Sequence, residues 1–268
     1  MAGARLSGSW LRRFFLRDDA LYKRYESTYQ AKTASAKIMY FILGLLPGLV
    51  AYLLLDIGPL FRAQLALTHL SPKNLQYAWL IIFTFGWHMF LPLLLLRYAD
   101  KLTLRESFAF LGLSRVDWRG LFLVLPVFCG IFALISMPYM KFVFTPLHNW
   151  LQSVQLFRQP PYSIFQNIPD NIYSFSPFAL FFLFVGNFLG EELYFRGYLM
   201  KKTAFLGGWN WTANSLLFAA YHLWQIPQTW PLAGLVLAFG LLMWLRKDLY
   251  VMVIFHLFLN MWLVYYHP

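Results

Sequence analysis

Two adjacent carboxylates and an arginine interrupt a long apolar run that begins at Pro177. The segment from Gly190 to Gly197 has the sequence GEELYFRG. A charged side chain near the centre of a bilayer costs about 2.5–3.5 kcal/mol on insertion scales, so such a residue needs a partner or a function. If the run is helical, Glu192 and Arg196 share a face and can pair, whereas Glu191 points about 100° away from Glu192. We therefore predict a structural ion pair and a chemical role for Glu191.

Two later apolar runs carry further polar side chains at a similar depth. His222 closes the segment that begins at Phe218, and His256 and Asn260 lie four residues apart on one helical face. At about 1.5 Å per residue, Glu191, His222 and His256 lie about 12–15 Å from the nearer end of their runs. A carboxylate, two imidazoles and an amide at one level meet the needs of a hydrolytic site, which are a base to activate water and donors to stabilise an oxyanion.

Three motifs occur in order on successive runs: Glu191-Glu192-x-x-x-Arg196, Phe218-x-x-x-His222 and His256-x-x-x-Asn260. This order resembles the CPBP family, which comprises CAAX prenyl-protein endopeptidases and bacteriocin-processing or immunity-type membrane proteins. The resembling region covers roughly residues 177–266.

The resemblance implies a glutamic intramembrane endopeptidase that uses neither a metal nor another cofactor. Its substrate would be a membrane-associated or lipid-modified protein or peptide. By the same resemblance, Glu191 with His222 activates the attacking water, and His256 with Asn260 holds the oxyanion. The implied structural supports are Glu192, Arg196 and Phe218.

Three other functions fit parts of the pattern. Glu191, His222 and His256 form a possible zinc-binding set, although no His-Glu-x-x-His helix is present to favour it. A non-catalytic scaffold or bacteriocin-immunity protein would retain the same motifs. A transporter could use the buried carboxylate as a proton relay, but the sequence shows no internal repeat.

Two further polar residues lie in the apolar runs without a motif of their own. His88, midway along the second run, is better explained as an interhelical hydrogen bond or a cavity contact than as a catalytic group. Asn187 lies four residues before Glu191, so in an α-helix it would share the face of Glu191 and help to orient it.

The composition identifies the class of protein that must position these groups. Of 268 residues, 60% are hydrophobic and 12% are charged, with a mean hydropathy of +0.54, whereas a typical soluble domain is roughly 25% charged. We predict an all-α polytopic integral membrane protein with seven to eight transmembrane helices, the eighth being an interfacial or re-entrant helix within residues 141–176. The seven apolar runs are Ile38–Leu55, Tyr77–Leu96, Gly120–Met140, Pro177–Met200, Thr212–Ile226, Pro231–Leu245 and Leu249–Tyr266.

Lys and Arg residues alternate in number between the segments that join these runs. Eight precede the first run, and the next three segments hold two, five and two. The positive-inside rule then places the N-terminus in the cytoplasm. We attribute the net charge of +11 to basic segments that set the orientation in the membrane, rather than to nucleic-acid binding. Residues 1–36 form a basic amphipathic segment suited to anionic lipid headgroups, and residues 37–268 form the membrane domain. A bacterial plasma membrane is the favoured location.

Overall fold

The protein is built from helices that are long and apolar enough to cross a membrane. The computed structural model describes residues 10, 12–164 and 176–265, and this part of the chain contains no strand. The chain is therefore an all-α integral membrane protein, as predicted. A count of seven to eight spans stays a prediction, because five helices meet the length and hydropathy expected of a span: Ala34–Leu55, Pro72–Ala99, Gly120–Ser153, Pro177–Lys202 and Ala204–Arg246, with a shorter apolar helix at Leu249–Leu263.

The helices before the motif region follow one another with short connections. Several of the long helices include π-helical turns, which are labelled η. The elements are α2 (Ala20–Gln30), α3 (Ala34–Leu55), α4 (Gly58–Thr68), α5 (Pro72–Ile81), η1 (Ile82–Phe90), α6 (Leu91–Leu94), η2 (Leu95–Ala99), α7 (Leu104–Leu111), η3 (Gly120–Val124), α8 (Leu125–Tyr139), η4 (Met140–Phe144) and α9 (Thr145–Ser153).

The motif region continues the same pattern and adds three 3-10 segments, η8, η9 and η10. Its elements are α11 (Pro177–Phe184), η6 (Val185–Gly190), η7 (Leu193–Leu199), α12 (Met200–Lys202), η8 (Ala204–Trp209), α13 (Asn210–Tyr221), η9 (His222–Gln225), α14 (Ile226–Thr229), η10 (Trp230–Leu232), α15 (Ala233–Arg246) and α16 (Leu249–Tyr265).

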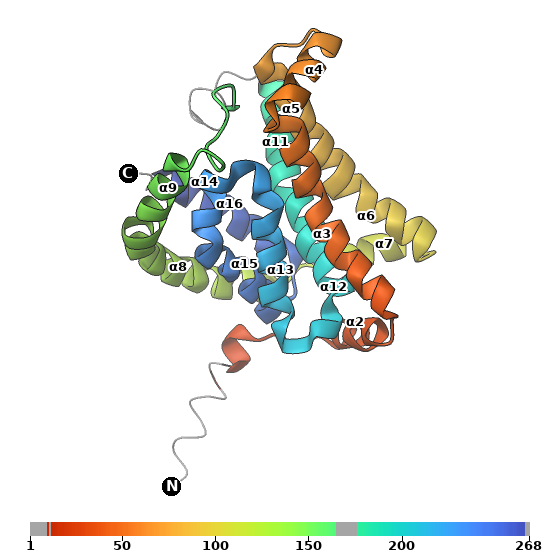
Figure 1. The fold of residues 1–268 in the computed structure, drawn as a ribbon. Helices are drawn as coiled ribbons and strands as arrows, with labels where there is room; N and C mark the ends of the chain where they lie inside the picture. Colours follow the sequence, from red (N-terminus) through yellow and green to blue (C-terminus); the bar gives the residue numbers. More distant parts are fainter. Residues whose placement is uncertain (1–9, 11, 165–175, 266–268) are drawn as a thin grey trace.

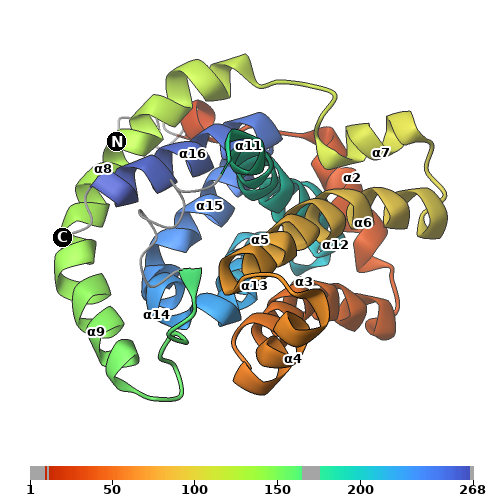
Figure 2. The ribbon, with the colours of Figure 1, turned by 90° about the horizontal axis from the view of Figure 1, so that it is seen from above.

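The helix that carries the first motif lies between other helices rather than at the edge (Figure 1). Its central part, η6 and η7, contacts η1 on one side and α16 on the other. Seen from above, the long helix from η3 to α9 curves along one side of the molecule, with α15 and α16 inside the curve (Figure 2). The first motif is thus surrounded by helices from both halves of the chain.

The stretch Ala204–Arg246 folds back on itself instead of forming one straight rod. Its middle part, His222–Leu232, is made of short 3-10 and α-helical turns, and the flanking helices α13 and α15 pack against each other. Gly240 permits this close approach, because a Cβ atom there would collide with the Trp211 carbonyl and the Ser215 hydroxyl. The Gly240 amide also donates a hydrogen bond of 3.2 Å to Ser215 Oγ.

The largest difference between a predicted run and its helix is at the end of the third run. The third apolar run ends at Met140 in the sequence, but its helix continues to Ser153. Lys141 therefore lies within a helix rather than in a connecting segment, and its side chain is exposed. The predicted interfacial helix falls partly on α9, which continues this long helix, and partly on residues 165–175, which lie outside the described residues.

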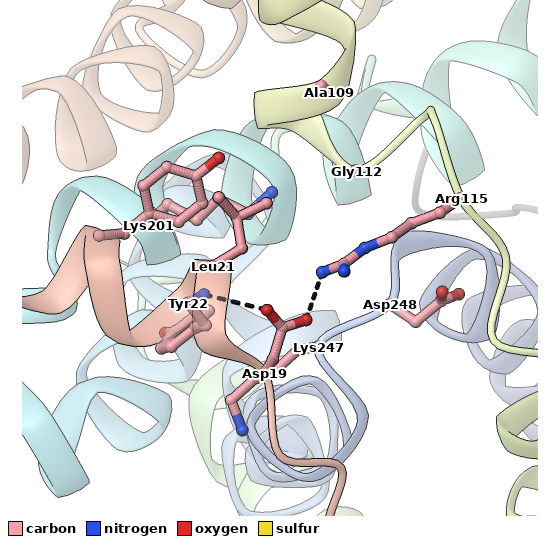
Figure 3. Close-up of a pocket in the computed structure, with 10 residues that line it drawn as sticks. Asp19, Leu21, Tyr22, Ala109, Gly112, Arg115, Lys201, Lys247 and Asp248 are labelled. Carbon is pink, nitrogen blue, oxygen red and sulfur yellow. Dashed lines mark hydrogen bonds and ion pairs between the residues drawn. The ribbon is translucent and has the colours of Figure 1, made fainter.

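Part of the basic N-terminal segment packs onto the helical body (Figure 3). Asp19 caps α2 by accepting a hydrogen bond of 3.0 Å from the Tyr22 amide, and it forms an ion pair with Arg115. Tyr22 and Tyr29 of α2 are buried. In addition, the Arg246 guanidinium donates to the backbone carbonyls of residues 14 and 15, so this segment is held by several charged groups.

Substituting Gly240 with alanine tests the close contact between α13 and α15. Gly240→Ala should lower the thermal unfolding midpoint in detergent, because overpacking a tight contact costs about 1–3 kcal/mol. Gly130→Ala, also within a helix, is the control, because a Cβ at Gly130 meets nothing within 4 Å. Equal midpoints for the two variants would contradict the close packing.

Candidate active site

The buried ion pair predicted from the four-residue spacing is present in the structure. Arg196 Nη1 lies 3.1 Å from Glu192 Oε1, and both side chains have no exposed surface. The guanidinium carbon of Arg196 also lies 4.1 Å from the Phe218 ring centre and 4.7 Å from that of Phe239. Aromatic faces attract a desolvated cation, so these rings compensate part of the lost hydration of Arg196.

His256 lies against this ion pair, not against Glu191 as its grouping in the sequence suggested. His256 Nδ1 is 2.9 Å from Glu192 Oε1, the same oxygen that Arg196 binds. The orientation does not meet hydrogen-bond geometry, because Nδ1 has no hydrogen-bond partner in the described part of the chain. We therefore treat the contact as a close electrostatic one. It fixes the ring beside Glu192.

Glu191 is buried with 3% of its surface exposed and has a different partner. The hydroxyl group of Tyr221 lies close enough to interact with its carboxyl group. Tyr221 belongs to no sequence motif of its own. Its only signal was its position immediately before His222. The two neighbouring glutamates therefore have separate environments, one within an ion pair and one beside a hydroxyl.

His222 is oriented by the end of its own helix. Its Nδ1 lies 2.9 Å from the carbonyl oxygen of Phe218. Because a carbonyl oxygen can only accept a hydrogen bond, Nδ1 carries the proton and Nε2 carries the lone pair of the neutral ring. The His222 ring lies 4.6 Å from that of Tyr221, measured between ring centres. His222 thus has an unprotonated nitrogen near the residue that contacts Glu191.

The two asparagines that the sequence analysis considered are placed differently. Asn260 lies one turn beyond His256 on α16 and is partly exposed. Asn187 lies in the π-helical segment η6, whose hydrogen bonds run from residue i to i+5, so the face relation assumed for an α-helix does not apply to it. Similar π-helical turns occur in two other long helices of the described chain, Pro72–Ala99 and Gly120–Ser153, and therefore do not mark the site.

Residues 173–262 match a family model described as type II CAAX prenyl endopeptidase Rce1-like. This match supports placing the chain in the CPBP family. The matched region contains all three motifs, and a family of CAAX prenyl endopeptidases is a protease family, which supports protease activity. No curated protein and no solved structure matches the chain.

Removing Arg196 tests the structural role of the ion pair. Arg196→Ala should lower the yield of folded protein and its thermal midpoint in detergent, because breaking a buried ion pair costs about 3–5 kcal/mol. Arg62→Ala, which removes an exposed arginine, is the control. The double variant Glu192→Leu/Arg196→Met should recover much of the loss, since neither charge of the pair remains. A stable Arg196→Ala variant would show that the pair is dispensable.

Proposed function

We propose that this protein is a glutamic-type intramembrane endopeptidase that hydrolyses a peptide bond of a prenylated or otherwise lipid-modified protein. The observation that carries the proposal is the separation of the two carboxylates. Glu192 is engaged by Arg196 and His256, whereas Glu191 is buried beside Tyr221, whose ring contacts that of His222. The match to the CAAX prenyl endopeptidase family supports the choice of substrate class.

The proposed reaction begins with a water molecule next to Glu191. The water oxygen attacks the carbonyl carbon of the peptide bond while one water proton passes to the Glu191 carboxylate. Tyr221 fixes the carboxyl group by its hydroxyl, and His222 Nε2 accepts a hydrogen bond from the same water. Collapse of the tetrahedral intermediate breaks the carbon–nitrogen bond, and Glu191 returns its proton to the leaving amine.

The oxyanion of that intermediate requires hydrogen-bond donors. We assign this role to His256 and Asn260, which are one helical turn apart on α16. His256 Nδ1 lies beside Glu192, which leaves Nε2 as the ring nitrogen that can face the oxyanion. Glu192 therefore acts on catalysis through His256, while Phe218 and Arg196 hold this arrangement in place.

The proposal also includes the membrane environment and the orientation of the protein in it. The apolar helices imply a lipid environment, and a prenyl chain would enter from the lipid phase while the peptide bond reaches Glu191. The charge distribution along the sequence favours a cytoplasmic N-terminus, and a bacterial plasma membrane is the proposed location. A soluble peptide without the lipid modification should bind more weakly, because it lacks the apolar anchor.

The zinc-dependent alternative requires Glu191, His222 and His256 to converge on one ion. Within the described residues, no group of three His, Cys, Asp or Glu side chains is placed to hold a metal ion. Instead, His222 Nδ1 bonds the Phe218 carbonyl and His256 Nδ1 faces Glu192. Carboxylate activation of water is the reading that these contacts favour.

Replacing Glu191 by glutamine tests the proposed base. Glu191→Gln should abolish cleavage of a farnesylated peptide in lipid vesicles, detected by mass spectrometry, because the amide keeps the shape but cannot accept the proton. The thermal midpoint should stay near that of the wild type. Glu26→Gln, at an exposed position, is the control and should cleave normally. Normal cleavage by Glu191→Gln would refute the mechanism, and an inert wild-type protein would favour the scaffold function.

Chelation distinguishes the carboxylate mechanism from the zinc alternative. Cleavage should continue after treatment with a strong zinc chelator, and elemental analysis of active protein should find far less than one equivalent of metal. A catalytic zinc would give the opposite pattern, with activity that is lost on chelation and restored by added zinc.

A further inference from the structure

His88 is a buried polar residue that neither the sequence motifs nor the proposed mechanism uses. Its side chain, on η1, has no exposed surface. Neither ring nitrogen has a hydrogen-bond partner among the described residues. Buried polar groups are nearly always hydrogen-bonded, so a buried imidazole with two unpaired nitrogens calls for a partner other than the protein.

Two glycines bring His88 close to the helix of the first motif. A Cβ atom at Gly190 would lie 2.6 Å from the Thr84 carbonyl oxygen and 3.5 Å from His88 Cβ. A Cβ at Gly186, one turn earlier, would collide with the Thr84 side chain. The two backbones therefore approach closely at these positions, and His88 lies alongside the residue that directly precedes Glu191.

The neighbours of His88 connect it to the other side of the candidate site. Its ring centre is 4.9 Å from that of Tyr221, whose hydroxyl interacts with Glu191. The rings of Tyr194 and Phe195 lie 5.2 and 5.8 Å away. His88 and His222 are also close enough for their charges to interact. His88 thus belongs to the group of polar side chains around Glu191.

A role in packing alone does not explain this arrangement. The ring is surrounded by aromatic rings, and a phenylalanine would fill similar space without burying two polar nitrogens. In contrast, a neutral imidazole offers one donor and one acceptor, which suits a small polar ligand such as water. The hydrolytic reaction requires a water molecule at this level of the protein.

We propose that His88 is a further polar residue of the hydrolytic site, which binds the attacking water together with Glu191. This inference rests on the proposed function. One hydrogen of the water is donated to the Glu191 carboxylate and the other to His222 Nε2, while the donor nitrogen of His88 binds one lone pair of the water oxygen. When the other lone pair of the oxygen bonds to the peptide carbonyl carbon, the first proton passes to Glu191 and the second stays on the oxygen, still bound to His222.

Two substitutions separate water binding from packing. His88→Phe keeps a ring but removes both nitrogens, and His88→Gln keeps a donor and an acceptor. With a farnesylated peptide as substrate, His88→Phe should lower kcat at least tenfold with KM within about threefold of the wild type. His88→Gln should recover a large part of kcat. Thermal midpoints should stay close to that of the wild type for both variants.

His148→Phe is the matched control. His148 bonds the Pro227 carbonyl through Nδ1 at 2.6 Å and stacks on Phe144, away from Glu191. The His148→Phe variant should leave kcat unchanged. If His88→Phe keeps its kcat, or if His88→Gln is as slow as His88→Phe, the proposal is wrong. Should His88→Phe fail to fold, His88→Leu replaces it in the comparison with His88→Gln.

A second measurement does not depend on activity. Full-length protein labelled with ¹⁵N-histidine in lipid vesicles should show magnetisation transfer from water protons to the His88 ring nitrogens in solid-state NMR. The signal is assigned by its loss in His88→Gln. If no magnetisation transfer from water to His88 is found, the water-binding role is wrong, even if the wild type cleaves the peptide. A hydrated His88 in an inert wild type supports the water site and counts against the proposed function alone.

Discussion

The burial of the Glu192–Arg196 ion pair is the constraint on which the rest of the site depends. Two opposite charges inside an apolar helical protein are tolerated only when they satisfy each other and their remaining polar atoms find compensation. Here the compensation comes from other elements. Phe218 on α13 and Phe239 on α15 cover the guanidinium, and His256 on α16 approaches the carboxylate. One pair therefore fixes three further helices around the first motif.

The same pair makes the two adjacent glutamates chemically unequal. Because the helix directs neighbouring side chains about 100° apart, only one of them can face Arg196. The other, Glu191, faces Tyr221 and remains outside the ion pair. The two consecutive glutamates are both buried and yet have different partners.

Close contacts between helices bring together polar residues that are distant in the sequence. Gly190 lets η1 approach the first motif, and Gly240 lets α15 approach α13. A methyl group at either position would separate these helices, and the polar side chains would lose their neighbours. Small residues at helix interfaces have the same effect in membrane proteins generally, since lipid provides no hydrophobic force that drives helices together.

The sequence by itself determined the all-helical membrane class, the position of the apolar runs and the Glu192–Arg196 contact. These features depend on hydropathy and on residues four apart, which are local in the chain. Only the tertiary structure decided that His256 faces Glu192, that Tyr221 contacts Glu191 and that His88 lies beside Tyr221. It also decided that the third helix continues past Met140 to Ser153. These contacts join residues 30 to more than 100 positions apart, and no spacing rule within a single helix can specify which faces of separate helices meet.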